Sequence, residues 1–158
     1  MLWGRFESAL AFATQARKGT RIPYLSHLLA VSALVLESGG DEDQAIAALR
    51  HDAVEDQGGR PALEEIRRRY GDRVAAIVEG CSDTDVIPKP PWKERKQAYV
   101  DHLAEAQPDV LLVSLADKVH NLRSIVLDHR FVDVGRHADD MSAPFWGTRV
   151  RGMSPPAD

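Results

Sequence analysis

Apolar residues recur at steps of three and four along most of the chain as far as His129, and this spacing limits the fold more than any other feature. The clearest case is PDVLLVSLADKVHNLRSIVLDH, which predicts one long helix from Pro108 to about His129. No stretch alternates apolar and polar residues over enough positions to predict a strand. The 158 residues are close to the usual size of one domain. The sequence therefore predicts an all-α protein, built as one bundle of helices around a single core.

Glycines, prolines and polar caps divide the rest of the chain into shorter segments. The predicted helices cover residues 5–18, 25–37, 42 to about 54, 63–70, 72–81 and 93–106. The stretch SDTDVIPKPP, residues 82–91, predicts a loop. Beyond residue 130 the helical spacing is lost, so we expect one domain over residues 1–130 and a partly ordered C-terminal tail over residues 131–158.

Charge and cysteine content narrow the choice of partners and compartment. Lys and Arg number 20 against 24 Asp and Glu, a net charge of −4, which does not favour a protein held to nucleic acid by its overall charge. No apolar run approaches the roughly 20 residues that a membrane span needs, and the first residues carry too much charge for a signal peptide. Cys81 is the sole cysteine, typical of a small buried residue in a reducing compartment. We therefore expect a cytoplasmic protein without nucleic-acid or membrane partners.

Four ionisable residues cluster at the end of an otherwise apolar helix. The segment AIAALRHDAVED, residues 45–56, would place His51, Asp52, Glu55 and Asp56 within about 140° of one another if the helix continued. Apolar residues cover nearly every other face, which indicates a helix buried inside the bundle. Unpaired polar groups there would cost several kcal/mol, so they need hydrogen bonds, ion pairs or a metal. The alternative is an exposed helix end that carries ordinary solvated acids.

Two further polar residues interrupt apolar helices. His27 begins the stretch HLLAVSALVL, and Asp117 breaks VLLVSLADKVHNL. A single residue of this kind is more often a satisfied structural group. Together with the His-Asp pair, however, these residues supply two imidazoles and two carboxylates from three helices, a ligand set suited to Mn²⁺, Fe²⁺ or Zn²⁺. The candidate metal ligands are His27, His51, Asp52 and Asp117.

The order of four motifs makes the chain recognisable. They are RKGTRIPYLSH (17–27), ALRHDAVED (48–56), Pro88-Lys89 ahead of ERK (94–96) and LADKVHNLRS (115–124). With these motifs the sequence resembles the HD phosphohydrolase superfamily, named after its His-Asp pair. Within that superfamily it resembles the hydrolase domain of the RelA/SpoT family and its small stand-alone relatives. The resemblance implies an HD-domain helical bundle. The final aromatic-bearing helix that closes the bundle in relatives is not evident in residues 131–158.

The resemblance also implies roles for individual residues. The four candidate ligands match the family's metal ligands, which normally hold Mn²⁺, and the catalytic pair that activates the attacking water matches Glu55 and Asp56. The family's nucleotide-binding residues match Arg17, Lys18, Lys89 and Asn121. The remaining histidines match no ligand position, and we expect them on the surface: His102, His120, His129 and His137.

The implied activity is a metal-dependent hydrolysis. The expected small-molecule substrate is guanosine 3′-diphosphate 5′-di- or triphosphate, from which the 3′-pyrophosphate is removed to give GDP or GTP and pyrophosphate. The acidic pair Glu55 and Asp56 favours this reaction over those of other HD phosphatases. Two alternatives stay open. The first is an HD phosphohydrolase that acts on a nucleoside phosphate or a nicotinamide dinucleotide phosphate, and the second is a non-catalytic nucleotide-binding module.

Overall fold

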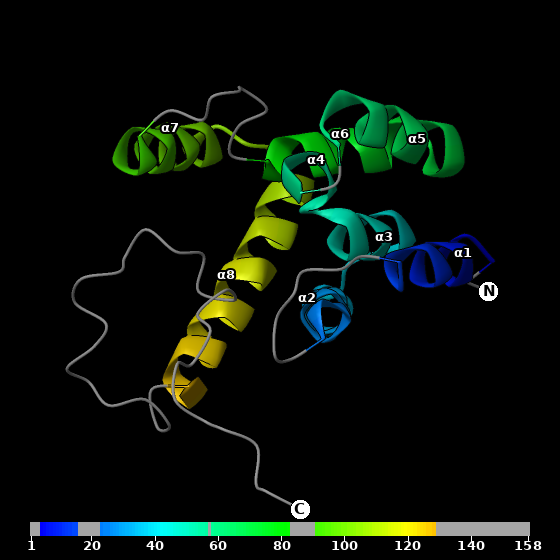
Figure 1. Cartoon of the computed structure of the whole chain (residues 1–158), viewed down its shortest axis with the longest axis horizontal. Helices are drawn as coiled ribbons and strands as arrows, with labels where there is room; N and C mark the ends of the chain where they lie inside the picture. Colours follow the sequence, from blue (N-terminus) through cyan, green and yellow to red (C-terminus); the bar gives the residue numbers. More distant parts are fainter. Residues whose placement is uncertain (1–3, 16–22, 57, 83–90, 129–158) are drawn as a thin grey trace, which may run out of the picture.

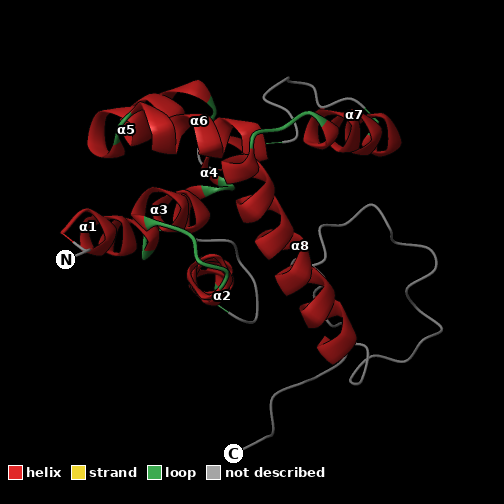
Figure 2. Ribbon diagram, turned by 180° about the vertical axis from the view of Figure 1, so that it is seen from behind, coloured by secondary structure: helices red, strands yellow, loops and turns green. Residues whose placement is uncertain are grey.

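The computed structural model describes residues 4–15, 23–56, 58–82 and 91–128, and within these ranges every regular element is a helix (Figure 2). The all-α prediction is therefore confirmed. The helices in the described ranges are α1 (Gly4–Ala13), α2 (Tyr24–Glu37), α3 (Glu42–Arg50), α4 (Ala53–Asp56), α5 (Arg60–Tyr70), α6 (Asp72–Cys81), α7 (Trp92–Ala104) and α8 (Pro108–Asp128). None of them is long and apolar enough to cross a membrane.

The bundle is organised around α3 and α8. Helix α3 packs against α1, α2, α6 and α8, and all six of its residues from Ala45 to Arg50 are buried. The longer α8 runs obliquely along the bundle, with α6 near its first turns and α2 farther along it (Figure 1). Helix α7 lies on the other side of the start of α8 from α1 and α3 in both views (Figures 1 and 2). The sequence pattern that makes residues 45–49 apolar on every face thus corresponds to a central helix.

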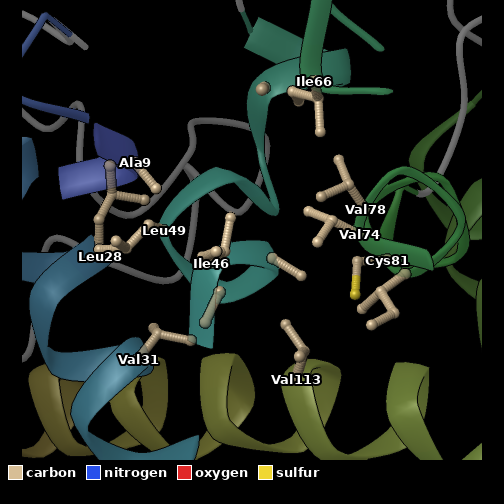
Figure 3. Close-up of a cluster of buried hydrophobic side chains, with 14 of the residues drawn as sticks. Ala9, Leu28, Val31, Ile46, Leu49, Ile66, Val74, Val78, Cys81 and Val113 are labelled. Carbon is tan, nitrogen blue, oxygen red and sulfur yellow. The ribbon is translucent and has the colours of Figure 1, made fainter. Parts of the chain in front are cut away.

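The core between these helices is filled by branched aliphatic side chains (Figure 3). Each such side chain contributes about 1.5 to 3 kcal/mol when it is fully removed from water. The side chains at the centre of the core come from α2, α3, α6 and α8: Leu28, Val31, Ile46, Leu49, Val74, Val78 and Val113. Cys81 is buried at the edge of this cluster, as predicted, and burial raises the pKa of its thiol to about 12.

Three predicted helix ends differ from the structure by three residues or more. The first helix ends at Ala13 rather than Lys18, and the Thr14 hydroxyl donates to the Ala11 carbonyl at 2.7 Å, where it competes with the helical pattern. The helix predicted to follow Pro61 begins at Arg60 rather than Leu63 and includes that proline, because proline is well suited to the first turn of a helix.

The third difference lies at the His-Asp pair. Helix α3 ends at Arg50, and His51 and Asp52 form a turn before the short α4. The Nδ1 atom of His51 lies 2.8 Å from the carbonyl oxygen of Ala48, the same oxygen that would accept the Asp52 N–H in a continuing helix. The side chain competes for that acceptor, so the arrangement of four ionisable residues on one continuous helix is not what the chain adopts. The predicted tail over 131–158 and positions 83–90 of the predicted loop lie outside the described residues.

Candidate metal centre

Three of the predicted ligands meet where α2, α8 and the turn after α3 come together. His27 shares the buried face of α2 with Leu28 and Val31, and Asp117 shares the buried face of α8 with Val113. His51 follows the central helix directly. The three residues are almost fully buried, since His27 is 2%, His51 3% and Asp117 6% exposed. The helical spacing that buries the apolar neighbours therefore also buries these polar groups.

The distances among these three side chains suit a shared metal ion. The Nε2 atom of His27 lies 3.3 Å from Nε2 of His51 and 3.3 Å from Oδ1 of Asp117. The Nε2 atom of His51 lies 3.6 Å from the same carboxylate oxygen. Ligand atoms that each lie about 2.1 Å from one divalent ion are roughly 3.0 to 3.5 Å from one another. His27, His51 and Asp117 form the metal triad, a term used below for these three residues, whose ligand atoms all lie within 4.8 Å of one another.

The fourth predicted ligand, Asp52, lies beside the metal triad. Its Oδ1 atom is 3.2 Å from Nε2 of His51, and its side chain is 26% exposed. Its other oxygen accepts a hydrogen bond from the hydroxyl of Tyr24, a buried residue. The Tyr24 ring also stacks on the His27 ring, with centroids 5.6 Å apart and planes inclined by 30°. Tyr24 thus contacts two of the predicted ligands at once.

The charged groups of the site shift one another's pKa values. Burial would lower the pKa of His51, but the carboxylates of Asp52 and Asp117 outweigh it and raise that pKa to about 9. Burial would raise the pKa of Asp117, but hydrogen bonds from His27 and His51 hold it far below its usual range. The Asp117 carboxylate also contacts Lys118 Nζ at 2.6 Å and accepts a hydrogen bond of 2.6 Å from the Asn121 amide. Protons of the histidines and of Lys118 therefore compensate the charge of the buried carboxylate.

A cavity of about 150 Å³ opens beside the metal triad. It is lined by His27, His51, Asp52, Glu55, Cys81, Lys96, Tyr99, Ser114, Asp117, Lys118 and Asn121. The ammonium groups of Lys96 and Lys118 lie 5.8 Å and 5.2 Å from the centre of the Tyr99 ring. Pockets that enclose a whole small-molecule ligand usually measure about 300 to 1,000 Å³. The described part of the cavity is thus too small for a whole nucleotide, but it is large enough for a phosphoryl group beside the two lysines.

The other predicted site residues divide into those the structure places and those it does not describe. Glu55 in α4 and Asn121 in α8 both line the cavity. Asp56 is the last residue of α4, and the position of its side chain is outside the description. The remaining predicted nucleotide-binding residues lie outside the described ranges: Arg17, Lys18 and Lys89.

His120 is not the surface residue that its sequence context predicts. It is half-buried, its Nδ1 atom lies 2.9 Å from Nδ1 of His27, and burial lowers its pKa. The exposed His102 does agree with the prediction. The missed signal is the spacing along α8: Asp117, His120 and Asn121 follow one another at steps of three and one, which places all three on the same helix face. The resemblance implied no role for Tyr24 or Lys118, although both lie within its motifs, and Tyr99 lies outside those motifs.

Comparison with known proteins agrees with this geometry. The profile of the HD domain family matches residues 6–151. A guanosine-3′,5′-bis(diphosphate) 3′-pyrophosphohydrolase, MESH1, of Xenopus tropicalis is 37% identical over 125 residues, which cover 74% of this chain and 67% of that protein. The human protein of the same name is 35% identical over 105 residues, which cover 65% of this chain and 56% of that protein.

A similar fold occurs among solved structures. The structure described as a metazoan orthologue of SpoT that hydrolyses ppGpp superposes with a TM-score of 0.70 at 27% sequence identity, and the match covers 80% of this chain and 73% of that one. The profile match spans most of the chain and includes every member of the metal triad. The chain belongs to the HD domain family.

Proposed function

We propose that this protein is a divalent-metal-dependent hydrolase of guanosine 3′-diphosphate 5′-di- or triphosphate, abbreviated (p)ppGpp. It would release the 3′-pyrophosphate and leave GDP or GTP. The observation that carries the proposal is the metal triad, buried beside a cavity that also contains Glu55 and two lysines. The names of the frog and human relatives support the choice of substrate.

The donor set supports a first-row divalent ion, and we propose Mn²⁺, with Fe²⁺ and Zn²⁺ as further candidates. His27, His51 and Asp117 would hold it, with Asp52 as the fourth ligand at the more exposed side. Such an ion, when bound, lowers the pKa of a coordinated water and polarises a phosphoryl oxygen. The two imidazoles and two carboxylates leave further coordination positions for water and substrate.

The remaining residues of the cavity supply acid–base and charge functions. Glu55 lines the cavity and would accept the proton of the attacking water, with Asp56 as its partner, a contribution of about 10²- to 10⁴-fold in rate. Attack at the phosphorus next to the ribose breaks the bond between that phosphorus and the 3′-oxygen. The 3′-oxygen is the leaving group and takes up a proton, and the water oxygen becomes part of the pyrophosphate that is released. Lys96 and Lys118 would offset its negative charge.

The size of the cavity supports a division of labour within the substrate. About 150 Å³ accommodates the phosphoryl end but not a complete nucleotide. We infer that the ribose and base are bound by Arg17, Lys18 and Lys89 in addition to Asn121. We further infer a cytoplasmic location, which the single buried cysteine supports, and a catalytic domain over residues 1–130.

The decisive experiment offers metal-reconstituted protein a panel of nucleotides and identifies the products. The panel contains ppGpp, GTP and NADP⁺, and the products are separated by anion exchange and assigned by phosphorus NMR. We expect ppGpp alone to be consumed, with GDP and pyrophosphate formed in equal amounts. Cleavage of GTP or NADP⁺ with ppGpp left intact would transfer the assignment to the other HD phosphohydrolases. A folded, metallated sample that binds these nucleotides but cleaves none would be a binding module.

A further inference from the structure

The two ring nitrogens of His27 face different partners. Its Nε2 atom faces the other members of the metal triad, at 3.3 Å from both His51 and Asp117. Its Nδ1 atom faces the opposite way, toward Nδ1 of His120 at 2.9 Å. The two rings are 4.9 Å apart between centroids and inclined by 54°. His27 therefore contacts the other two members of the metal triad through Nε2 and His120, which lies outside the triad, through Nδ1.

A hydrogen bond between these two nitrogens needs one proton and one lone pair. A neutral imidazole carries its proton on one nitrogen and a lone pair on the other. When Nε2 of His27 gives its lone pair to a metal, the proton must lie on Nδ1, and Nδ1 of His120 must accept it. A histidine ligand almost always donates its second N–H to such an acceptor, which fixes the tautomer and the ring orientation.

We propose that His120 is a positioning residue, which holds the imidazole of His27 in the orientation and tautomer that direct its Nε2 atom to the metal. The inference rests on the proposed metal site. His51 has the equivalent support from the backbone, since its Nδ1 atom lies 2.8 Å from the Ala48 carbonyl oxygen. Each buried imidazole of the metal triad thus has an acceptor behind it. Only the acceptor of His27 is a side chain, so only that one can be removed by substitution.

The position of His120 on α8 gives the contact a second effect. His120 lies one helical turn beyond Asp117, so α8 supplies both a metal ligand and the group that orients the ligand from α2. Residues on α8 therefore determine the geometry of two members of the metal triad. A change at His120 should alter metal binding although His120 is not itself a ligand.

The test measures metal affinity in two variants and a control. His120→Phe keeps a ring but removes the acceptor, whereas His120→Asn returns an oxygen acceptor near the position of Nδ1. The matched control is His102→Phe, which removes an exposed histidine on α7. Affinities of the full chain for Mn²⁺ and Zn²⁺ are measured by competition with a chromogenic chelator at one pH. We expect His120→Phe to bind about 10- to 100-fold more weakly. His120→Asn should recover most of that loss, and the control should match the parent.

Two results would contradict the role of His120 but leave the proposed metal site unaffected. One is a folded His120→Phe protein with the parental affinity, and the other is a His120→Asn protein that binds no better than His120→Phe. A parent protein that binds neither metal would instead overturn the proposed metal site, and the role of His120 with it. Nitrogen–proton correlation spectra of the zinc-loaded parent test the same point without any variant. They should place the His27 proton on Nδ1, and a proton on Nε2 would contradict the proposal.

Discussion

Replacing Gly80 by alanine should destabilise the contact of α6 with α8. A Cβ atom at this position would lie 2.7 Å from Cγ2 and 3.0 Å from Cγ1 of Val110. Carbon atoms in good contact are about 3.5 to 4.0 Å apart, and rotating the valine cannot clear both of its methyl groups. Such overpacking costs about 1 to 3 kcal/mol, and the two simultaneous clashes place this site in the upper part of that range, at about 2 to 3 kcal/mol. The higher helix propensity of alanine returns about 1 kcal/mol. We therefore expect the free energy of unfolding to fall by about 1 to 2 kcal/mol.

A double-mutant cycle isolates the contact from other effects. Val110→Ala alone removes two methyl groups from a residue that is 7% exposed, at a cost of about 2 kcal/mol. In that background, Gly80→Ala should be neutral or stabilising by up to about 1 kcal/mol, because the new methyl group fills the space that the valine left. The two substitutions should thus couple by about 2 kcal/mol, with the double variant more stable than the sum predicts.

Urea unfolding of the four metal-free proteins, followed by circular dichroism, measures the cycle. Gly4→Ala is the matched control, since nothing lies within 4 Å of a Cβ atom at that position. Asp117 lies two helical turns beyond Val110 on α8, so Gly80→Ala should also weaken metal binding. A neutral or stabilising effect of Gly80→Ala in the parent would refute the packing of α6 on α8 described above.

Three further predictions concern the metal triad and the catalytic base. Asp117→Ala, if folded, should lose the metal that the parent retains after purification without chelator; elemental analysis that finds equal metal in both would exclude Asp117 as a ligand. Glu55→Gln should lower kcat by about 10²- to 10⁴-fold with the metal content unchanged, and a parallel loss of metal would make Glu55 a ligand instead. The pKa of His51 is raised to about 9, so metal binding below that pH must displace its proton. The affinity for Mn²⁺, measured by electron paramagnetic resonance, should therefore rise about tenfold per pH unit from pH 7 toward 9. The metal-free protein should lose stability over the same interval, since a raised pKa stabilises only while the group is protonated, and a flat profile in both measurements would contradict the assigned pKa.

The parts of the fold that could be predicted are those that depend on local spacing. Val113 and its apolar neighbours on α8 reveal a buried helix face, and Asp117 is conspicuous because it interrupts that face. The end of α3 could not be predicted in this way, because Ala53 and Val54 continue the apolar pattern beyond the turn and are themselves buried. The turn depends on a side-chain contact of His51 with the backbone, which apolar spacing does not encode.

The arrangement of the site required the relative placement of helices far apart in the chain. In the sequence, His120 is a polar residue near the end of an apolar stripe, which is a common pattern at a protein surface. Its contact with His27 arises only because α2 packs against α8. The packing of α2 against α3 likewise makes the Tyr24 hydroxyl a donor to Asp52, in the turn that follows α3. The predicted metal ligands are separate interruptions of apolar segments, so they could be listed from sequence, whereas the groups that support them could not.

The metal triad joins segments that are far apart along the chain: His27 is 24 residues from His51, and Asp117 lies much farther along, on α8. An unfolded chain does not hold these groups together, so an ion bound to them would favour the native state over the unfolded one. At a free metal concentration one hundred times the dissociation constant, this linkage adds about 2.7 kcal/mol. For a chain of this length that gain corresponds to roughly 5 to 10 °C in Tm. Metal starvation in a cell would then lower the amount of folded protein, because unfolded chains are degraded. It would also lower the turnover rate of the molecules that remain, so the rate of (p)ppGpp hydrolysis would fall through both effects.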